Sequence, residues 1–441
     1  MKLWILLIIL TVVPIGQAAS LRIEGERAWL NAVDGASLQE VLQLFGDRGV
    51  EVLVDPTLKL NSITGEWENT AIERLIAQLA RPHSYLVEWK RVDSSLGTLY
   101  QVSSIRIFAD GNSDAAKPLK QKRKVLDVVT GKNGLKYIRN EIMIGFDEEA
   151  GVEDLHALLR KINGTMIEVI NPPGIYRIRL NDDLSVEDAM ALANAHDGVA
   201  SSEPNLAFPR LDAAPVSVSA PDQRINLNLQ PGETAVAVFD SGLDPKYVDH
   251  PLIRGTYDAV DPSAAISDPS GHGTLTAMVA AGAITPLGAE PAETGVPVLA
   301  IRTFDENGMT SSDTIYRALE FAANSDVNII SMSWGSKVDS HFLQTAMDFA
   351  ALNGMTLYAS AGNEPTGVPI YPAGYGSVIA VGGLDSEGNL WDQSNYGDFV
   401  SSYGPAFAYF NGKLYTGTSI ATPKIAAEAA KARSAKTLPV K

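Results

Sequence analysis

Four polar residues stand where the sequence predicts the end of a strand or the start of a helix. They are Asp240 in "VFDSG", His272 in "GHGT", Asn363 in "SAGNE" and Ser419 in "GTSIATP". A serine hydroxyl becomes a nucleophile when a histidine takes its proton, and a carboxylate can hold that histidine in the required tautomer. A side-chain amide can donate to an oxyanion. These residue types in this order favour nucleophilic acyl transfer.

Each residue also has an ordinary structural interpretation. Asp240 and Asn363 could form turns, His272 could cap a helix or lie at the surface, and Ser419 could be a helix cap. Each of these interpretations is reasonable alone. Together they require four coincidences at one edge of one predicted sheet, so the chemical interpretation is favoured.

The segment around Ser419 predicts the start of a helix. Pro423 is tolerated in the first turn, where its missing N–H costs nothing, and the following alanines are strong helix formers. We therefore expect Ser419 on the turn that leads into this helix. The partial positive charge of a helix N-terminus favours a negative charge that develops nearby.

Residues 222–441 alternate between apolar strands and amphipathic or small-residue helices. The strands are "TAVAVFDSG", "VPVLAIRTF", "VNIISMSWG", "MTLYASAGN" and "GSVIAVGGL". Near-continuous apolar strands are typical of a parallel sheet that is buried on both faces. The pattern predicts an α/β fold with a doubly wound, mainly parallel sheet, in which chemistry gathers at the carboxyl ends of the strands.

With these motifs, residues 222–441 resemble the subtilisin-like serine proteases (subtilases, peptidase family S8). The resemblance implies that Asp240 is the acid, His272 the base and Ser419 the nucleophile. Asn363 and the backbone N–H of Ser419 would form the oxyanion hole. The motif "GHGT" continues with Leu275, where most members carry a histidine, and the predicted peptidase domain is short at its C-terminus.

The segments "SMSWG" and "SAG" resemble the substrate-binding walls of that family. An extended peptide would add as a strand beside "SMSWGS". No acidic residue stands out as a selector for basic side chains, so we expect small or apolar side chains in the pocket. The sequence predicts no metal site and no required cofactor, and a structural calcium stays unassigned. The residues implied in substrate binding are Ser331, Ser333, Trp334, Gly335, Ala361 and Gly362.

Residues 137–210 predict a small α+β domain with the order βαββαβ, a ferredoxin-like unit. Directly before a subtilisin-like region, it resembles the propeptide of that family, which acts as intramolecular chaperone and inhibitor. We expect self-cleavage between Leu206 and Gln223, with the processing site in the linker 211–221. The alternative is a small domain that stays attached.

Residues 20–110 predict another small α+β domain, with Ser37 as a helix cap. Its order resembles the short N-terminal domain of secretins and TonB-dependent receptors, which suggests an envelope protein partner; an unrelated α+β domain is the alternative. The lysine-rich linker 111–136 is a solvated connection or a protease-sensitive joint.

The start of the chain indicates export. Residues 1–19 have a lysine, a short apolar run and small residues, as a signal peptide does, although an uncleaved anchor remains open. No other segment is apolar enough to span a bilayer. The chain has 441 residues, no cysteine and a net charge of −17, which argues against a nucleic-acid partner.

Two functions therefore remain. The first is a secreted or periplasmic serine endopeptidase that acts on protein or peptide substrates and processes itself. The second is an envelope-binding adaptor whose protease domain cleaves only itself or is inactive.

Overall fold

The structure is a computed structural model that describes residues 19–119, 126–132, 134–170, 174–181, 184–209, 226–291 and 295–437. The chain divides into two compact units. One unit holds Met1–Lys122 with Arg139–Pro204, and the other holds Arg123–Ile138 with Asn205–Lys441. Within the described residues, no helix is both long and apolar enough to cross a membrane. The predicted signal peptide, apart from residue 19, lies outside the described residues, as do 120–125 and 210–225.

The first part of the first unit consists of two small sheets around two helices, α1 (Leu38–Gly46) and α2 (Ile72–Leu79). Ser37 caps α1, as the sequence predicts, and its hydroxyl and the Glu40 carboxylate form a capping box. The sheets have the strand orders β1-β2-β4 and β5-β6-β3-β7. Their strands are β1 (Ala19–Glu24), β2 (Arg27–Ser37), β3 (Glu51–Val54), β4 (Ser62–Ala71), β5 (Ser84–Ser94), β6 (Gly97–Phe108) and β7 (Lys117–Pro118).

The second part of this unit has the predicted βαββαβ order. It runs β9 (Lys136–Phe146), α3 (Val152–Lys161), β10 (Gly164–Ile170), β11 (Ile175–Leu180), α4 (Val186–Asn194) and β12 (Val199–Pro209). The strands lie in the order β10-β11-β9-β12, as in a ferredoxin-like sheet. A short strand, β8 (Val128–Thr130), pairs with the start of β9.

The two parts of the first unit contact each other through specific polar groups. The backbone N–H of Ile23 donates to Thr165 Oγ1 at 2.9 Å, and that of Leu96 donates to Tyr176 Oη at 3.2 Å. Arg160 pairs with Glu24 at 2.7 Å. Because Tyr176 is fully buried at this contact, the N-terminal part covers the face of the ferredoxin-like sheet that holds it.

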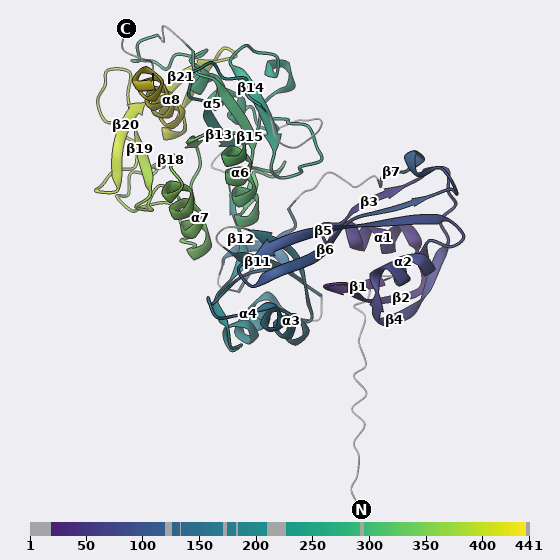
Figure 1. Cartoon of the computed structure of the whole chain (residues 1–441). Coiled ribbons are helices and arrows are strands. Elements are labelled where there is room, and N and C mark those ends of the chain that lie inside the picture. The colour runs from purple at the N-terminus through teal and green to yellow at the C-terminus, as the bar shows by residue number, and fades with distance from the viewer. Residues whose placement is uncertain are drawn as a thin grey trace, which may run out of the picture. The chain divides into compact units, whose positions relative to one another are not determined.

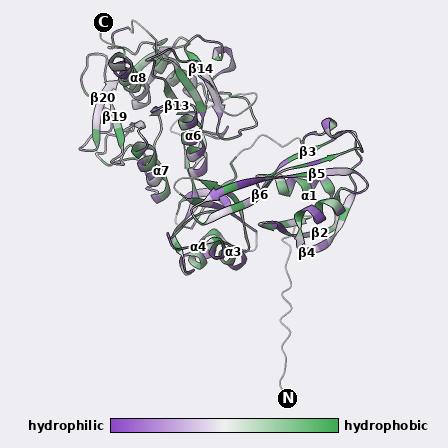
Figure 2. Ribbon diagram, in the orientation of Figure 1, coloured by the Kyte–Doolittle hydropathy of each residue, from purple (hydrophilic) through white to green (hydrophobic). Residues whose placement is uncertain are grey.

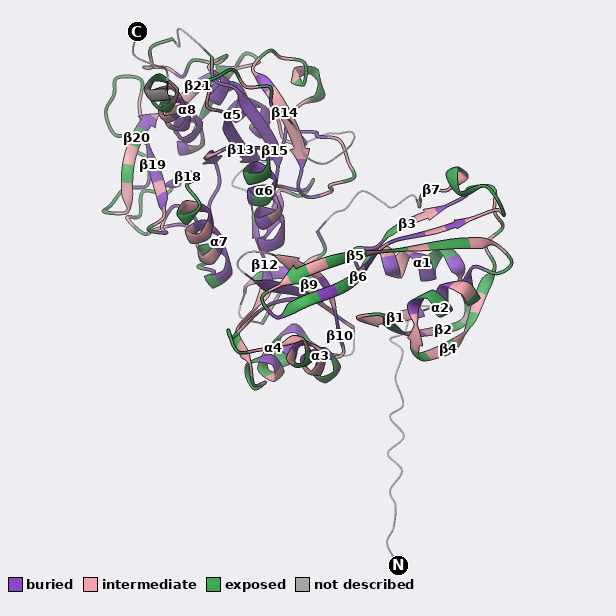
Figure 3. Ribbon diagram, in the orientation of Figure 1, coloured by how far each residue is buried: buried purple, intermediate pink, exposed green. Residues whose placement is uncertain are grey.

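The second unit is built on a seven-stranded parallel sheet with the order β14-β15-β13-β17-β18-β19-β20 (Figure 1). All five predicted strands are present: β13 (Val236–Asp240), β15 (Val298–Arg302), β17 (Ile329–Met332), β18 (Thr356–Ser360) and β19 (Val378–Leu384). Figure 3 shows β13 and β15 buried along their length. The doubly wound, mainly parallel α/β fold is therefore confirmed.

The sequence missed the two edge strands, β14 (Ile253–Asp258) and β20 (Val400–Pro405). Both lie at the ends of the sheet and are only partly buried, so their sequences mix polar and apolar residues. A hairpin of β21 (Phe407–Phe410) and β22 (Lys413–Thr416) was also not predicted. It leads directly into the helix that carries Ser419.

Helices cover both faces of the sheet. Helices α5 (His272–Ala281) and α8 (Thr418–Thr437) pack on Val236 and Val238 of β13, and the intervening Ala237 faces the other side. Helices α6 (Ser312–Asn324) and α7 (His341–Leu352) pack against each other on the opposite face (Figure 1). Both of these carry hydrophobic and hydrophilic residues (Figure 2), as helices with one solvent-facing side do.

Candidate active site

Asp240 is the last residue of β13, at the carboxyl edge of the sheet, where the sequence places it. Its side chain is almost completely buried, with 1% of its surface exposed. The backbone N–H of Ser241 donates to Oδ1 at 2.7 Å, and the Thr276 hydroxyl donates to Oδ2 at 3.1 Å. The backbone N–H of Thr303 donates to the Asp240 carbonyl oxygen at 2.7 Å. These contacts fix the carboxylate before any substrate binds.

The His272 imidazole meets this carboxylate edge-on. Its Nδ1 lies 2.8 Å from Asp240 Oδ1 and 3.0 Å from Oδ2. This contact directs Nδ1–H to the acid and leaves Nε2 free of that interaction, the tautomer that a general base requires. His272 is the first residue of α5, so the sequence prediction of a helix start is confirmed.

Two glycines let the acid and base segments approach each other. A Cβ at Gly273 would clash with the backbone of Gly242, and a Cβ at Gly242 would clash with the Ser267 carbonyl. The glycines of "DSG" and "HGT" are therefore needed for backbone packing between the end of β13 and the start of α5.

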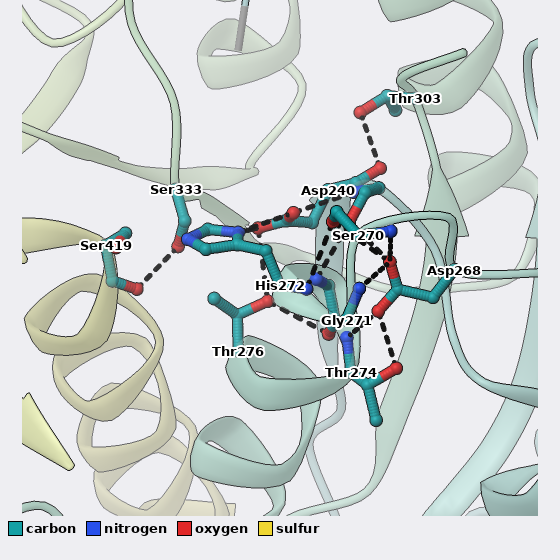
Figure 4. Close-up of polar contacts among 12 residues, drawn as sticks. Asp240, Asp268, Ser270, Gly271, His272, Thr274, Thr276, Thr303, Ser333 and Ser419 are labelled. Atoms are coloured by element: carbon teal, nitrogen blue, oxygen red, sulfur yellow. Dashed lines mark hydrogen bonds and ion pairs between the residues drawn. The ribbon is translucent and has the colours of Figure 1, made fainter. Parts of the chain in front are cut away.

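Asp268 is a functional candidate that sequence reasoning missed. Its buried carboxylate accepts six hydrogen bonds, from Ser241 Oγ, the N–H and Oγ of Ser270, Gly271 N–H, and the N–H and Oγ1 of Thr274. Three of these residues, Ser270, Gly271 and Thr274, flank His272 in the chain (Figure 4). An aspartate followed by Pro, Ser and Gly just before the histidine was the available signal, since aspartate organises such turns.

Ser419 is not on a turn before the helix. Helix α8 begins at Thr418, so Ser419 lies inside the first turn and Pro423 is interior to the helix, not in its first turn. The expectation was wrong because a proline in a helix interior requires another group to satisfy the freed carbonyl, which local sequence does not reveal. Here the Ser333 hydroxyl, from the loop after β17, donates to the Ser419 carbonyl oxygen at 2.9 Å.

Figure 4 shows Ser419 and Ser333 on the side of the imidazole ring that faces away from Asp240. Among the residues drawn there, no hydrogen bond joins Ser419 Oγ to His272. Contacts between nucleophile and base are often long without substrate and tighten in the reacting complex. The structure thus brings the three predicted residues to one place, with the acid–base pair already formed.

Asn363 is held beside Ser419 from the loop after β18. Its Oδ1 accepts from the backbone N–H and the hydroxyl of Thr418, both at 3.0 Å. A Cβ built on Gly417 would lie 2.9 Å from Ser419 Oγ and 3.3 Å from Asn363 Nδ2. The amide nitrogen and the hydroxyl therefore flank the same small space, which only a glycine at 417 leaves open.

The predicted substrate-binding residues lie in two neighbouring segments of the sheet edge. Ser333, Trp334 and Gly335 follow β17, and Ala361 and Gly362 follow β18. Ser331 lies inside β17 and is fully buried, so it sits farther from the strand end than the others.

Ile370 lies against both segments and was not singled out from the sequence. A Cβ at Gly335 or at Gly362 would clash with Ile370 Cδ1. The isoleucine side chain therefore occupies the space between the two glycines. No sequence signal pointed to Ile370, because its position depends on how a distant loop folds back.

The end of β12 lies along a second edge of this region. Ala207, Phe208 and Pro209 pair antiparallel with β16 (Met309–Ser311), with Phe208 opposite Thr310. Phe208 is fully buried, and its ring centroid lies 6.4 Å from that of Trp334. Trp334 in turn meets Phe304 edge-on at 5.7 Å. An extended segment of the chain thus already occupies the edge of the peptidase unit.

Two protein families and a solved structure match parts of this chain. Residues 232–438 match the subtilase family (peptidase S8), and residues 123–205 match the fervidolysin N-terminal prodomain family. The fold is similar to that of fervidolysin from Fervidobacterium pennivorans, a keratinolytic enzyme related to subtilisin. The TM-score is 0.52 at 19% identity, covering 70% of this chain and 57% of fervidolysin.

Individual relatives of this chain are also proteases of this kind. The chain is 32% identical to thermitase of Thermoactinomyces vulgaris over 43% of this chain and 71% of thermitase. It is 28% identical to the minor extracellular protease Epr of Bacillus subtilis (strain 168), over 64% of this chain but only 44% of Epr. The chain therefore belongs to the subtilase family of serine peptidases and carries a prodomain. The adaptor hypothesis is not favoured by these matches, and none of them covers a secretin-like domain.

Proposed function

We propose that the protein is a serine endopeptidase in which Ser419 is the nucleophile, His272 the general base and Asp240 the orienting acid. The observation that carries the proposal is the contact between Asp240 and His272 Nδ1 at 2.8 Å, with Ser419 on the other side of the ring (Figure 4). A buried carboxylate stabilises the imidazolium that forms when histidine takes the serine proton.

In the proposed reaction, Ser419 Oγ attacks the carbonyl carbon of the scissile peptide while its proton moves to His272 Nε2. The oxyanion that forms is stabilised by Asn363 Nδ2 and the backbone N–H of Ser419. His272 then protonates the leaving amine, and the peptide C–N bond breaks. Water, deprotonated by His272, attacks the acyl-enzyme and releases Ser419 with a new carboxylate product.

We propose that the substrate lies extended across this edge and inserts a small side chain beside the loops that follow β17 and β18. Ile370 supports this size limit because it fills the space between Gly335 and Gly362. A larger side chain would have to displace Ile370 or move the loops. No cofactor is required for this chemistry, and a structural calcium is unassigned.

We also propose that the protein cuts its own chain to release the prodomain. Leu206, Ala207 and Phe208 are buried, and the strand from Ala207 to Pro209 is paired with β16. A paired, buried peptide bond is not accessible for cleavage. We therefore narrow the expected cut from 206–223 to 210–223, a segment outside the described residues.

The proposed location is outside the cytoplasm, secreted or periplasmic, with the signal peptide removed. This proposal is supported by the similarity to Epr, whose name describes an extracellular protease. An envelope partner that binds residues 20–110 remains a proposal from sequence resemblance.

The test is the intact mass of the purified precursor without its signal peptide, beside a Ser419→Ala variant, over several hours. We expect only the wild-type chain to break, within 210–223, and the product to digest casein. If both chains stay whole, and the product of cutting by another protease digests nothing, the peptidase proposal is wrong.

A further inference from the structure

The loop between β15 and β16 contains a carboxylate whose two oxygens have different partners. Asp305 Oδ1 accepts from the backbone N–H groups of Asn307 and Met309, both at 2.9 Å. Asp305 Oδ2 accepts from the backbone N–H of Leu126 at 3.0 Å. Leu126 lies within residues 123–205, which match the prodomain family, whereas Asp305 lies in the loop after strand β15 of the peptidase sheet, so one carboxylate joins the two regions.

A second turn in the same unit shows what such an aspartate does without this contact. Asp385 Oδ1 accepts from the backbone N–H groups of Glu387 and Asn389, both at 2.9 Å. In both turns the aspartate N–H donates at 2.8 Å to the carbonyl four residues later. Among the described residues, the partner of Asp385 Oδ2 is instead the exposed side chain of Asn389, at 3.3 Å. Turn formation therefore requires Oδ1 alone, and Oδ2 of Asp305 is available for another role.

Burial distinguishes the two carboxylates as well. Asp305 is 2% exposed, whereas Asp385 is only partly buried. Leu126, Ile138 and Ala207 form a small hydrophobic cluster with Met309, four residues after Asp305. The segments before and after the prodomain thus converge on the same short stretch of the peptidase unit.

The far end of β16 carries a comparable contact. Asn205 Nδ2 donates to Asp313 Oδ1 at 2.8 Å, and both residues are buried. Asp313 also holds Arg317 at 2.8 Å and Ser311 Oγ at 2.6 Å, so its charge is compensated within the peptidase unit. The strand pairing of 207–209 with 309–311 lies between the two carboxylates.

We propose that Asp305 is a docking acceptor that retains the pro-region, defined here as Leu126–Pro209, on the peptidase unit after processing. The proposal rests on the proposed self-cleavage. Once the bond within 210–223 is cut, only non-covalent contacts hold the pro-region on the peptidase unit. The hydrogen bond from Leu126 N–H to Asp305 is charge-assisted and shielded from water, so its loss accelerates release of the pro-region.

The discriminating variant is Asp305→Asn. Asparagine keeps Oδ1 for the turn, but its Nδ2 faces the Leu126 N–H, donor against donor. Asp385→Asn is the matched control, since it makes the same change in the same kind of turn away from the pro-region. After self-cleavage, we expect Asp305→Asn to release the pro-region on the order of 10- to 100-fold faster than the control, by native mass spectrometry.

A second pair of variants changes Leu126, the donor of the hydrogen bond to Asp305. Leu126→Pro removes the donor and leaves Asp305 intact, and Leu126→Ala keeps the donor while removing the same apolar side chain. Release should be faster in Leu126→Pro than in Leu126→Ala, and adding Asp305→Asn to Leu126→Pro should add little. Equal release rates in Asp305→Asn and Asp385→Asn, with additive effects of the pair, would overturn the proposal.

An experiment on a chain that cannot cleave itself tests the docking role of Asp305 independently of the proposed peptidase function. In the Ser419→Ala chain, hydrogen exchange at the Leu126 amide should be on the order of 10- to 100-fold faster with Asp305→Asn than with Asp385→Asn. Protection at Gly308 N–H, which bonds the Asp305 carbonyl at 3.1 Å, reports that the turn is intact. Unchanged Leu126 exchange refutes the docking role even if the wild-type chain processes itself. Failure of processing alone refutes only the proposed function.

Discussion

The Ser333 hydroxyl donates to the Ser419 carbonyl oxygen at 2.9 Å. Pro423, which lies one helical turn further along α8, cannot donate to this carbonyl. In a regular helix the N–H of residue 423 would bond the carbonyl of residue 419. Proline has no N–H, so the carbonyl of the proposed nucleophile is satisfied by the loop that follows β17. The loop that follows β17 thereby holds the proposed nucleophile in place.

This relationship predicts a rescue. Ser333→Ala removes this partner of the partly buried Ser419 carbonyl, which costs about 1–3 kcal/mol and should lower kcat about tenfold or more. Adding Pro423→Ala supplies the missing helical N–H and should restore most of the loss. The measurement is kcat for the two single variants and the double variant on one peptide substrate. A double variant as poor as Ser333→Ala would show that the hydroxyl acts in some other way.

Asp268 should be important for both stability and kcat, although we assign it no chemical step in the reaction. Asp268→Ala removes an acceptor of six hydrogen bonds around His272, so we expect about 3 kcal/mol or more of lost stability and a large loss of kcat. Thermal unfolding of the Ser419→Ala background and kcat in the active chain measure the two effects. Asp261→Ala is the control, since Asp261 serves only a local turn with Ser263 at the surface. Similar losses in both variants would contradict the role of Asp268.

Ile370→Ala should enlarge the pocket between Gly335 and Gly362. We expect kcat/KM for substrates with a large apolar side chain to rise relative to alanine substrates by about 10- to 200-fold, the range for a hydrophobic pocket. Stability should fall by about 2–5 kcal/mol, as for other large-to-small changes in a packed site. A matched series of peptides that differ at one side chain measures the selectivity. If the preference does not change, Ile370 does not limit the pocket.

Tyr176→Phe should loosen the N-terminal part from the ferredoxin-like sheet. The change removes the acceptor for Leu96 N–H, which is buried, and the partner of Ser95 Oγ at 3.1 Å. A buried N–H without a partner costs about 1–3 kcal/mol. Limited proteolysis of the Ser419→Ala chain should then cut earlier between residues 94 and 98. Tyr100→Phe, at an exposed position on β6, is the control, and equal cutting in both variants would contradict the contact.

The sequence by itself determined the parallel sheet and indicated which residues form the candidate site. Strands buried on both faces need continuous apolar runs, so β13, β15, β17, β18 and β19 are visible as patterns. Asp240 and His272 are likewise marked by the glycines around them, because the close approach of two backbone segments excludes a Cβ. The βαββαβ unit was readable from the periodicity of its helices and strands.

Only the tertiary structure decided how these residues are held. The contacts of Ser333 with Ser419, of Ile370 with Gly335, and of Asp305 with Leu126 join segments that are far apart in the chain. Local propensity carries no information about such pairs, because each partner is compatible with many environments until packing selects one. The interior position of Pro423 is the clearest case, since its cost in the helix is offset by a hydroxyl 90 residues earlier.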